Sequence, residues 1–428
     1  MSEQRPSVLC LGTLDTKGPE TRVLAEGIRQ RGCDTIILDC GILGGPEGVV
    51  PDISREEAAR AAGTTIEALR DAGSRGAAIE QMLKGVQVIG QRLLDEGRLH
   101  GVVALGGAEG SVLAAATMTQ LPVGLPKLLV SPIASGRRIF DPFVGTRDVT
   151  VMHSVVDILG LNSIAMEIFE NASAAIAGMA IAFHSRSGLP GAHAGGQQVA
   201  ATMLGNTTRP LMWIREQLAA EQQELVIFHA NGVGGAAMEE AVLAGHFTGV
   251  IDYTLSELAG EVAGGFHVCA DRTRLVEAGR LGLPQVIVPG CVDFTVHGPR
   301  TEIPEDKQGR PSHYHNPKFT LVRLTAEEQL EVGRRLVTRV NDARGPVVIV
   351  LPMGGLSVPD APGAEFQDAA ISGAFRDLLR NQLSDEIELV EVDAHINDQD
   401  CAKAVLAAWR SVAGHRKVGP SHAEGEPG

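Results

Sequence analysis

The sequence predicts an α/β protein with two doubly wound, Rossmann-like parallel-sheet lobes and an interlobe cleft. The chain has 428 residues, more than one hydrophobic core normally serves, so we expect two domains. Apolar, strand-like runs alternate with helix-like segments, which is typical of βαβ units and parallel sheets. Several of these runs end in a glycine-rich turn before a helix, where proteins of this class bind ligands.

In the first half, strands are predicted at Val8–Leu11 and Thr35–Asp39, with a helix at Pro19–Arg31 between them. Ser54, with Glu57 three residues later, is typical of a capping box that opens a short helix. The pattern continues with an amphipathic helix, a strand with a glycine turn, and a further strand, at Ile79–Glu96, from Gly101 and from Pro126.

The segment Asn162–Ala182 is small and apolar, but Glu167, Glu170 and Asn171 interrupt it. We therefore expect a buried helix and not a membrane span. A glycine-rich stretch follows, and it places the domain boundary between residues 190 and 191.

The second half repeats the alternation and forms a second α/β domain over residues 191–414. Its strands are predicted in "QQVAATML" and near the starts of five further runs, at Glu224, Gly249, Pro284, Pro346 and Ile387. The polar tail at 415–428 is expected to be disordered.

Composition limits the function classes. The net charge of −15 argues against a nucleic-acid partner, which requires a basic surface. We also expect no membrane partner and a cytoplasmic location, because the sequence shows no apolar signal segment and no uninterrupted apolar run of about 18 residues. The cysteines form no C-x-x-C pair and are expected to be buried free thiols: Cys10, Cys33, Cys40, Cys269, Cys291 and Cys401.

The first candidate site is the turn "GTLDTKG" after the first strand. Gly12 allows a close backbone approach, Thr13 and Thr16 offer hydroxyl groups, and Lys17 offers a positive charge. Asp15 could orient a metal-bound water or a ribose. Backbone N–H groups at a helix N-terminus attract anions, so the turn indicates an anion site. A simple capped helix start, with Lys17 exposed to water, is the alternative.

Two further loops of the first half follow strands. Gly106, Gly107, Gly110 and Ser111 form a glycine turn whose physics resembles that of a phosphate cradle. The loop with Ser131, Ser135 and Gly136 is either a third part of the site or an ordinary strand-to-helix connection. Two glycine turns at strand ends of one sheet would face one crevice.

The second half has a glycine turn of its own, in "HANGVGGAAME". His229 and Asn231 come at the strand end, and Gly232, Gly234 and Gly235 could offer backbone amides to an anionic substrate. The alternative is a tight turn with a core histidine.

Histidines form the last constellation. His313 and His315 lie two apart on an extended segment and should point to the same side. With Asp293 or His395 they could ligate a metal, or act directly as acid–base groups. A hydrogen-bonding loop is the third possibility. Asp393 could orient His395, Asn397 is expected to cap the last helix, and Asn316 is a candidate substrate contact.

Eight segments together resemble one family: "GTLDTKGPE", "GGAEGS", "LPKLLVSPIASG", "SVVDILGLNSI", "FHANGVGGAAME", "HYHNP", "LPMGGLSVPDAPG" and "DAHIND". This family comprises bacterial proteins similar to the N-terminal, ATP-binding region of the tomato mosaic virus resistance protein. The resemblance covers nearly the whole chain. It implies ATP with Mg²⁺ in the first lobe, and a homodimer. The antiviral role is not carried over, since the plant protein continues into a further, barrel-type domain.

Applied to matching positions, the resemblance implies an ATP role for Gly12, Thr13, Asp15, Thr16 and Lys17, and for Gly106, Gly107, Gly110 and Ser111. Glu109 departs from the family pattern, because it adds a negative charge near the triphosphate unless it faces magnesium or points away.

Three functions remain open. The first is an enzyme that acts on a small acidic or carbonyl substrate at the interlobe cleft, with histidine acid–base groups. The second is a regulatory or interaction module that binds ATP without catalysis. The third is a metal-dependent lyase or hydrolase.

Overall fold

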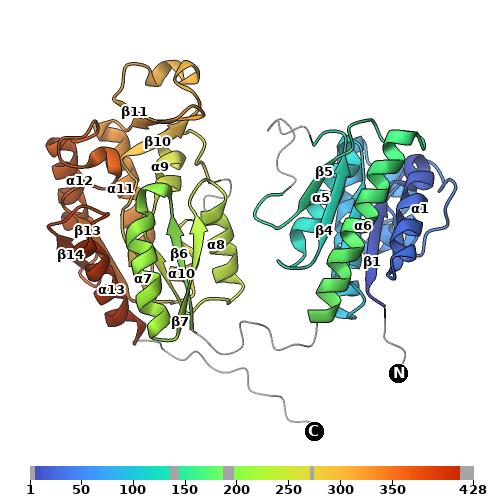
Figure 1. Ribbon diagram of the computed structural model, residues 1–428, viewed down its shortest axis with the longest axis horizontal. Helices are drawn as coiled ribbons and strands as arrows, with labels where there is room; N and C mark the ends of the chain where they lie inside the picture. The colour runs from blue at the N-terminus through green and yellow to red at the C-terminus, as the bar shows by residue number, and fades with distance from the viewer. Residues whose placement is uncertain (1–4, 135–143, 187–196, 270–273, 415–428) are drawn as a thin grey trace, which may run out of the picture. The chain divides into compact units, whose positions relative to one another are not determined.

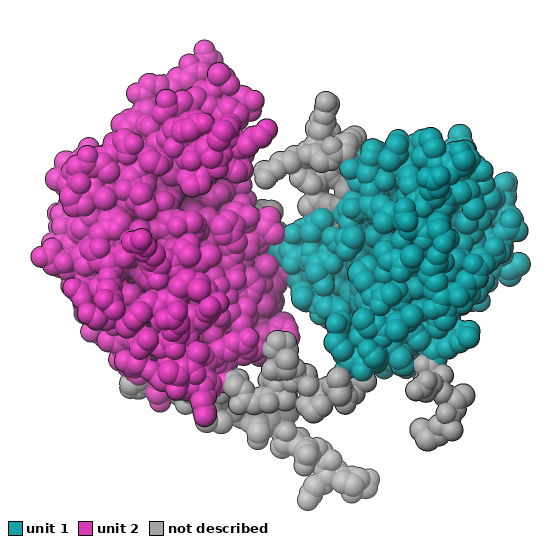
Figure 2. Space-filling view, in the orientation of Figure 1, with its two compact units in different colours: residues 1–192 teal, residues 193–428 magenta. Residues whose placement is uncertain are grey.

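The computed structural model describes residues 5–134, 144–186, 197–269 and 274–414. The chain divides into two compact units, residues 1–192 and 193–428 (Figures 1 and 2). The predicted domain boundary and the predicted disordered tail lie outside the described residues, as do Ser135 and Gly136. Each unit is described by itself.

Unit 1 is built on a five-stranded sheet in the order β2-β1-β3-β4-β5, with every neighbouring pair parallel. Its strands are β1 Ser7–Gly12, β2 Asp34–Asp39, β3 Gly101–Leu105, β4 Lys127–Ser131 and β5 Thr150–His153. Buried apolar side chains fill both faces of the central strands, because helices cover the sheet on both sides.

The helices of unit 1 form two layers (Figure 1). On one face α1 Leu14–Gln30 packs against α6 Ser163–Arg186. On the other lie α2 Arg55–Ala61, α3 Ile66–Arg70, α4 Arg75–Asp95 and α5 Ala108–Gln120. The short helix predicted after Ser54 is present, and Ser54 caps it by accepting a hydrogen bond from the Glu57 amide.

Helix α6 corresponds to the small apolar segment of the sequence. By length and composition it could cross a membrane. In the structure one face is buried against α1 and the sheet, through residues that include Phe169, Ile176 and Ala180. The expected buried helix is therefore present, with its opposite face exposed.

Unit 2 has a six-stranded parallel sheet in the order β14-β13-β9-β8-β6-β7. The strands are β6 Gln197–Met203, β7 Gln223–His229, β8 Gly249–Asp252, β9 Gln285–Ile287, β13 Val347–Pro352 and β14 Glu388–Val392. Helices α7 Thr208–Ala220 and α13 Gln399–Ala413 pack on one face. On the other face lie α8 Gly234–Leu243, α9 Ser256–Ala263, α10 Glu277–Arg280, α11 Ala326–Asn341 and α12 Ala369–Gln382.

A separate antiparallel sheet, which the sequence did not predict, is inserted into unit 2. Its order is β10-β12-β11, with β10 Phe294–His297, β11 Ser312–Asn316 and β12 Phe319–Arg323. Apart from this insertion, the prediction of two doubly wound parallel-sheet lobes is confirmed. All six cysteines are buried and free, as predicted.

Candidate functional site

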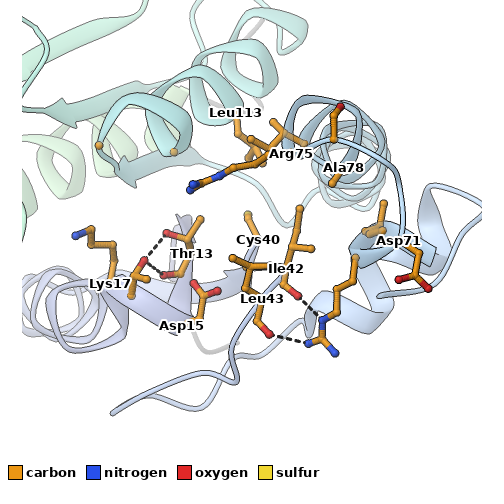
Figure 3. A pocket seen from close by; sticks show the side chains of 18 of the residues that line it. Thr13, Asp15, Lys17, Cys40, Ile42, Leu43, Asp71, Arg75, Ala78 and Leu113 are labelled. Atoms are coloured by element: carbon orange, nitrogen blue, oxygen red, sulfur yellow. Dashed lines mark hydrogen bonds between the residues drawn. The ribbon is translucent and has the colours of Figure 1, made fainter. Parts of the chain in front are cut away.

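A cavity of about 790 Å³ in unit 1 brings two of the predicted turns together. Thr13, Asp15, Thr16 and Lys17 line it from the turn after β1, and Gly107 and Gly110 line it from the start of α5 (Figure 3). The sheet order 2-1-3-4-5 reverses direction between β1 and β3, and the carboxyl ends of the strands at such a point form the usual binding crevice. The predicted convergence of the two turns is therefore present.

The start of α5 offers backbone amides to the cavity. Gly107 is the N-cap residue and provides no side-chain cap. The first N–H groups of a helix have no partner inside the helix, and the helix dipole adds partial positive charge there. This end of the cavity is therefore suited to an anionic group.

The turn after β1 is more constrained than its sequence implies. The Thr13 and Thr16 hydroxyls lie 3.2 Å apart, and Asp15 Oδ2 accepts a hydrogen bond from the Gly44 amide at 3.1 Å. The Lys17 ammonium donates to the Ile158 carbonyl. Because an ammonium has three donors, Lys17 retains capacity for a ligand in the cavity that it lines.

Four residues predicted to contact ATP do not line the cavity and lie behind its wall: Gly12, Gly106, Ser111 and Ser131. Ser111 Oγ donates to the Gly106 carbonyl at 2.8 Å and shares a 2.7 Å hydrogen bond with Ser131 Oγ. Both serine side chains are fully buried. A Cβ on Gly106 would lie 2.6 Å from the Ser111 nitrogen, and one on Gly12 would lie 2.6 Å from Thr21 Oγ1. These residues position the turns, and the predicted direct contact is corrected.

Two arginines complete the cavity and were missed in the sequence. Arg75 extends from the start of α4 toward the side where Thr13 lies (Figure 3). Arg70 donates to the Ile42 and Leu43 carbonyls at 2.8 and 2.9 Å, and so fixes the loop after β2 against α3. The sequence signal was present, since an arginine directly follows Ser74, which caps α4.

The rest of the lining is largely apolar, although Arg70 and Asp71 also belong to it. Its apolar residues include Ile42, Leu43, Leu69, Ile79 and Leu113. Cys40 also lines the cavity, but burial raises the pKa of its thiol, which is therefore neutral and unreactive at neutral pH. The cavity thus combines a polar, cationic end with a largely apolar one.

The glycine turn of unit 2 already holds an anion of its own. The amides of Gly232 and Gly235 donate to Glu257 Oε1 at 2.8 and 3.0 Å. A Cβ on Gly235 would lie 1.7 Å from Glu257 Oε2. The predicted substrate role of these two glycines is therefore corrected, because a buried side chain occupies their amides.

The other predicted members of this turn differ: Gly234 is structural, and the substrate role of His229 and Asn231 stays a prediction. A Cβ on Gly234 would lie 2.0 Å from the His229 carbonyl oxygen, so this glycine is required for a close backbone approach. His229 and Asn231 are exposed, and Asn231 Oδ1 accepts from the Val233 amide at 3.4 Å.

Glu257 belongs to a buried charge cluster around one guanidinium. Arg274 Nε donates to Glu257 Oε2 at 2.7 Å, and its terminal nitrogens reach Asp252 and Glu239. All four side chains are buried. Burial raises the pKa of Glu239 to about 7, although Arg274 opposes the shift. The cluster therefore joins β8, α8 and α9 from inside.

Asp293 is fully buried and accepts a 2.6 Å hydrogen bond from Ser357 Oγ. Burial first, and then the charge of Asp360, raise the pKa of Asp293 to about 7. Its other oxygen has no hydrogen-bond partner among the described residues. A fully buried carboxyl cannot contact a substrate, so the catalytic prediction for Asp293 is corrected.

His395 lies beside the same serine but has no ring nitrogen to spare. Nε2 donates to the Ser357 carbonyl at 2.8 Å, and Nδ1 accepts from the Asn397 amide at 3.1 Å. The ring is thereby held as the neutral Nε2–H tautomer. The structure gives His395 a structural role in place of the predicted acid–base role. Asp398, and not Asn397, is the N-cap residue of α13.

His313 and His315 do not form the predicted metal site, and their acid–base role stays a prediction. The β11–β12 pairing is irregular between Tyr314 and Asn316, which breaks the alternation that would place both histidines on one side. His313 Nδ1 lies 3.1 Å from Glu365 Oε1, and His315 is exposed. Asn316 closes the hairpin by accepting from two amides, at 2.8 and 3.0 Å. No group of three metal-binding side chains occurs among the described residues.

Similar proteins were found by sequence and by structure. A UPF0261 protein of Clostridium tetani is 36% identical over 402 residues, which cover 93% of this chain and 96% of that protein. The tomato (Solanum lycopersicum) ToMV resistance protein Tm-1(GCR237) is 33% identical over 427 residues, or 95% of this chain. The match covers 56% of the tomato protein, so the chain spans little more than half its length.

Among solved structures, a putative UDP-N-acetylglucosamine 2-epimerase from Listeria monocytogenes matches at 12% identity with a TM-score of 0.24, over 66% of this chain and 79% of that one. That likeness is too slight to say anything of ligands. Two family models cover the chain: the N-terminal domain of uncharacterised protein family UPF0261 matches residues 6–185, and its C-terminal domain matches 197–413. The chain therefore belongs to the UPF0261 family, and the resemblance to the tomato protein that its motifs predicted is confirmed.

Proposed function

We propose that unit 1 binds ATP with Mg²⁺ in the 790 Å³ cavity at the ends of β1 and β3. One observation carries the proposal: the two turns to which the family resemblance assigned ATP line one cavity. Its volume is within the range of small-molecule sites, and its apolar lining with a few polar groups is typical of them.

The two ends of the cavity match the two ends of a nucleotide. The phosphates would lie against the amides at the start of α5, with Lys17 and Arg75 contributing positive charge. The base would lie against Ile42, Leu69 and Ile79. Magnesium would enter bound to the phosphates, and Asp15, the carboxylate of the turn after β1, would face it from the cavity lining.

The same geometry favours a binding module over an enzyme with histidine catalysis. Within unit 2, both ring nitrogens of His395, one of the histidines proposed for catalysis, are used by hydrogen bonds of the fold. A module of this kind would respond to nucleotide by becoming more stable or by changing its affinity for a partner. The small-molecule substrate, the homodimer and the cytoplasmic location stay predictions.

Isothermal titration calorimetry with ATP and Mg²⁺ tests the proposal. We expect binding and a rise in melting temperature, equivalent to about 2.7 kcal/mol when ligand is a hundredfold above its dissociation constant. Arg75→Ala should weaken binding about tenfold, or about 1.4 kcal/mol. Arg60→Ala is the matched control, because Arg60 is exposed on α2 and does not line the cavity. No heat and no thermal shift with the wild type would overturn the proposal.

A further inference from the structure

A second cavity, of about 380 Å³, lies in unit 2 at the end of β10. Three segments surround it: the loop after α9, the end of β10, and the loop that precedes β11. Its principal residues are Gly265, His297, Gly298, Glu302, Asp306 and Lys307. Neither the nucleotide cavity nor the predicted histidine site includes these residues.

Lys307 supplies a buried positive charge to this cavity. Its side chain is 9% exposed, and its ammonium contacts Asp306 Oδ2 at 3.1 Å. That is the one hydrogen bond of the ammonium to the described residues. An ammonium has three donors, and buried donors without acceptors are costly. The remaining donors are therefore suited to the oxygens of a ligand.

His297 forms a second wall beside Lys307. The residue is 4% exposed, and its Nε2 lies 2.9 Å from Thr295 Oγ1. Gly265, with a φ of +95°, brings its backbone close to the ring, where a Cβ would lie 3.4 Å from His297 Cε1. Burial, and then the charge of Lys307, lower the pKa of His297, so its ring is neutral at pH 7. The inner part of the cavity therefore has one positive charge, on Lys307.

The rim of the cavity has the opposite charge. Glu302 and Asp306 are exposed, and the Glu302 carboxylate leans over Gly298, where a Cβ would lie 3.0 Å from Glu302 Oε2. Lys307 is thus the buried charged side chain of the cavity, paired with Asp306, and Glu302 and Asp306 are its exposed charged side chains. A matching ligand carries an anionic group at its inner end and a cationic group at its outer end.

We propose that this cavity binds a free α-amino acid. Its carboxylate accepts hydrogen bonds from the Lys307 ammonium, and its ammonium group faces Glu302 and Asp306 at the rim. The cavity volume lies at the small end of the range for ligand sites, which fits a ligand of this size. This site is in unit 2 and does not depend on the nucleotide proposal for unit 1.

Thermal-shift assays of the dialysed full-length protein test the proposal. Each common amino acid is added separately at millimolar concentration, and the corresponding carboxylic acid without the amino group serves as its control. We expect at least one amino acid to raise the melting temperature, with its des-amino acid less effective. No shift with any amino acid would overturn the proposal, and so would an equal shift with the des-amino acid.

Calorimetry on variants then assigns the contacts, using the amino acid with the largest thermal shift. Lys307→Met should weaken binding about ten- to a hundredfold, as expected for loss of a hydrogen bond to a charged group. Lys318→Met, at an exposed hairpin lysine outside the cavity, should bind as the wild type does. Unchanged affinity of Lys307→Met would contradict the assignment.

Glu302→Gln provides an independent test, because this exposed residue can change without disturbing folding. It should weaken binding of the amino acid two- to fivefold, as expected for an exposed ion pair, and should leave binding of the des-amino acid unchanged. Equal effects on both ligands would remove Glu302 from the site.

Discussion

The two glycine turns of this protein look alike in sequence and differ in the structure. Both follow a parallel strand and open a helix, and both were expected to hold an anion. At Gly107–Gly110 the start of α5 faces a cavity of about 790 Å³. At Gly232–Gly235 the amides of Gly232 and Gly235 donate to Glu257. This residue lies on α9, which follows α8 and β8 in the chain. A glycine turn therefore predicts which backbone amides are available to an acceptor. It does not predict whether that acceptor is a ligand or a side chain of the protein itself.

The largest loss of stability should come from removing Arg274, the cation that pairs with Glu257 beside the glycine turn of unit 2. Arg274→Met leaves Asp252, Glu257 and Glu239 buried without their counter-ion, and breaking such a cluster costs about 3–5 kcal/mol. Urea unfolding followed by tryptophan fluorescence measures this, because Trp213 and Trp409 both lie in unit 2. Arg280→Met, at a half-exposed arginine paired with Glu277, should cost under about 1 kcal/mol. Equal losses in both variants would contradict the role of the cluster.

The contrast between the turns explains what the sequence could predict. Most strands of the two parallel sheets, and the glycine turns after them, are local patterns of apolar runs and glycines, and these were predicted. Strand β5, the antiparallel sheet and the starts of α1 and α4 were not predicted. Glu257 was missed because nothing near Gly232 indicates which distant acid will reach it. Arg75 was missed although Ser74 marks the start of its helix, because the sequence does not show that two short helices bring this start back to the turn after β1.

Hydroxyl groups and histidines were over-interpreted for a related reason. Ser111 and Ser131 have the right chemistry for a phosphate, but they bond to each other behind the wall. His395 stands at a strand end, and both of its nitrogens are used within the fold. The antiparallel sheet that carries His313 depends on pairing with β12, whose irregular register the spacing of the histidines could not indicate.

A second experiment would make the turn of unit 2 resemble that of unit 1. Glu257→Ala empties the two amides and removes one acceptor of Arg274, so we expect a loss of about 2–3 kcal/mol in the free energy of unfolding. Acetate or formate should then bind in the space and restore part of the melting temperature. The wild type, with the same salt, should show no such rise.

Sodium chloride at equal ionic strength is the control for general salt effects. If acetate raises the melting temperature of the variant no more than chloride does, the turn does not act as an anion site even when vacant. The idea that both glycine turns can bind an anion would then be wrong for the turn of unit 2.

The third test uses the buried acids of unit 2, and it measures how the free energy of unfolding changes with pH. The pKa of Asp293 is raised to about 7 from an ordinary value of 3.8. Between those values the folded state retains a proton that the unfolded state releases. The contribution of Asp293 is therefore fully present below about pH 4 and is lost as the pH rises toward 7.

Asp293→Asn removes this contribution, since the amide does not ionise. The stability of the variant relative to the wild type should therefore improve from pH 4 to pH 8, as followed by tryptophan fluorescence in urea. Glu239, whose pKa burial raises to about 7, adds a slope of the same sign, so the variant should flatten the profile only in part. A constant difference between the two proteins across this range would show that Asp293 is ionised throughout.

The smallest expected effect is on binding alone, at the open turn of unit 1. A Cβ on Gly107 would have no heavy atom within 4 Å, and its φ of −67° is accessible to any residue. Gly107→Leu should therefore fold normally, while its side chain crowds the amides at the start of α5. We expect ATP affinity to fall about tenfold, or about 1.4 kcal/mol, with the melting temperature without ligand nearly unchanged.

Gly178→Leu is the control, at an exposed position of α6 where a Cβ also has no heavy atom within 4 Å. This variant should bind ATP as the wild type does. Unchanged affinity of Gly107→Leu would mean that the ligand does not use this turn, and the contrast with Gly232–Gly235 would lose its functional meaning.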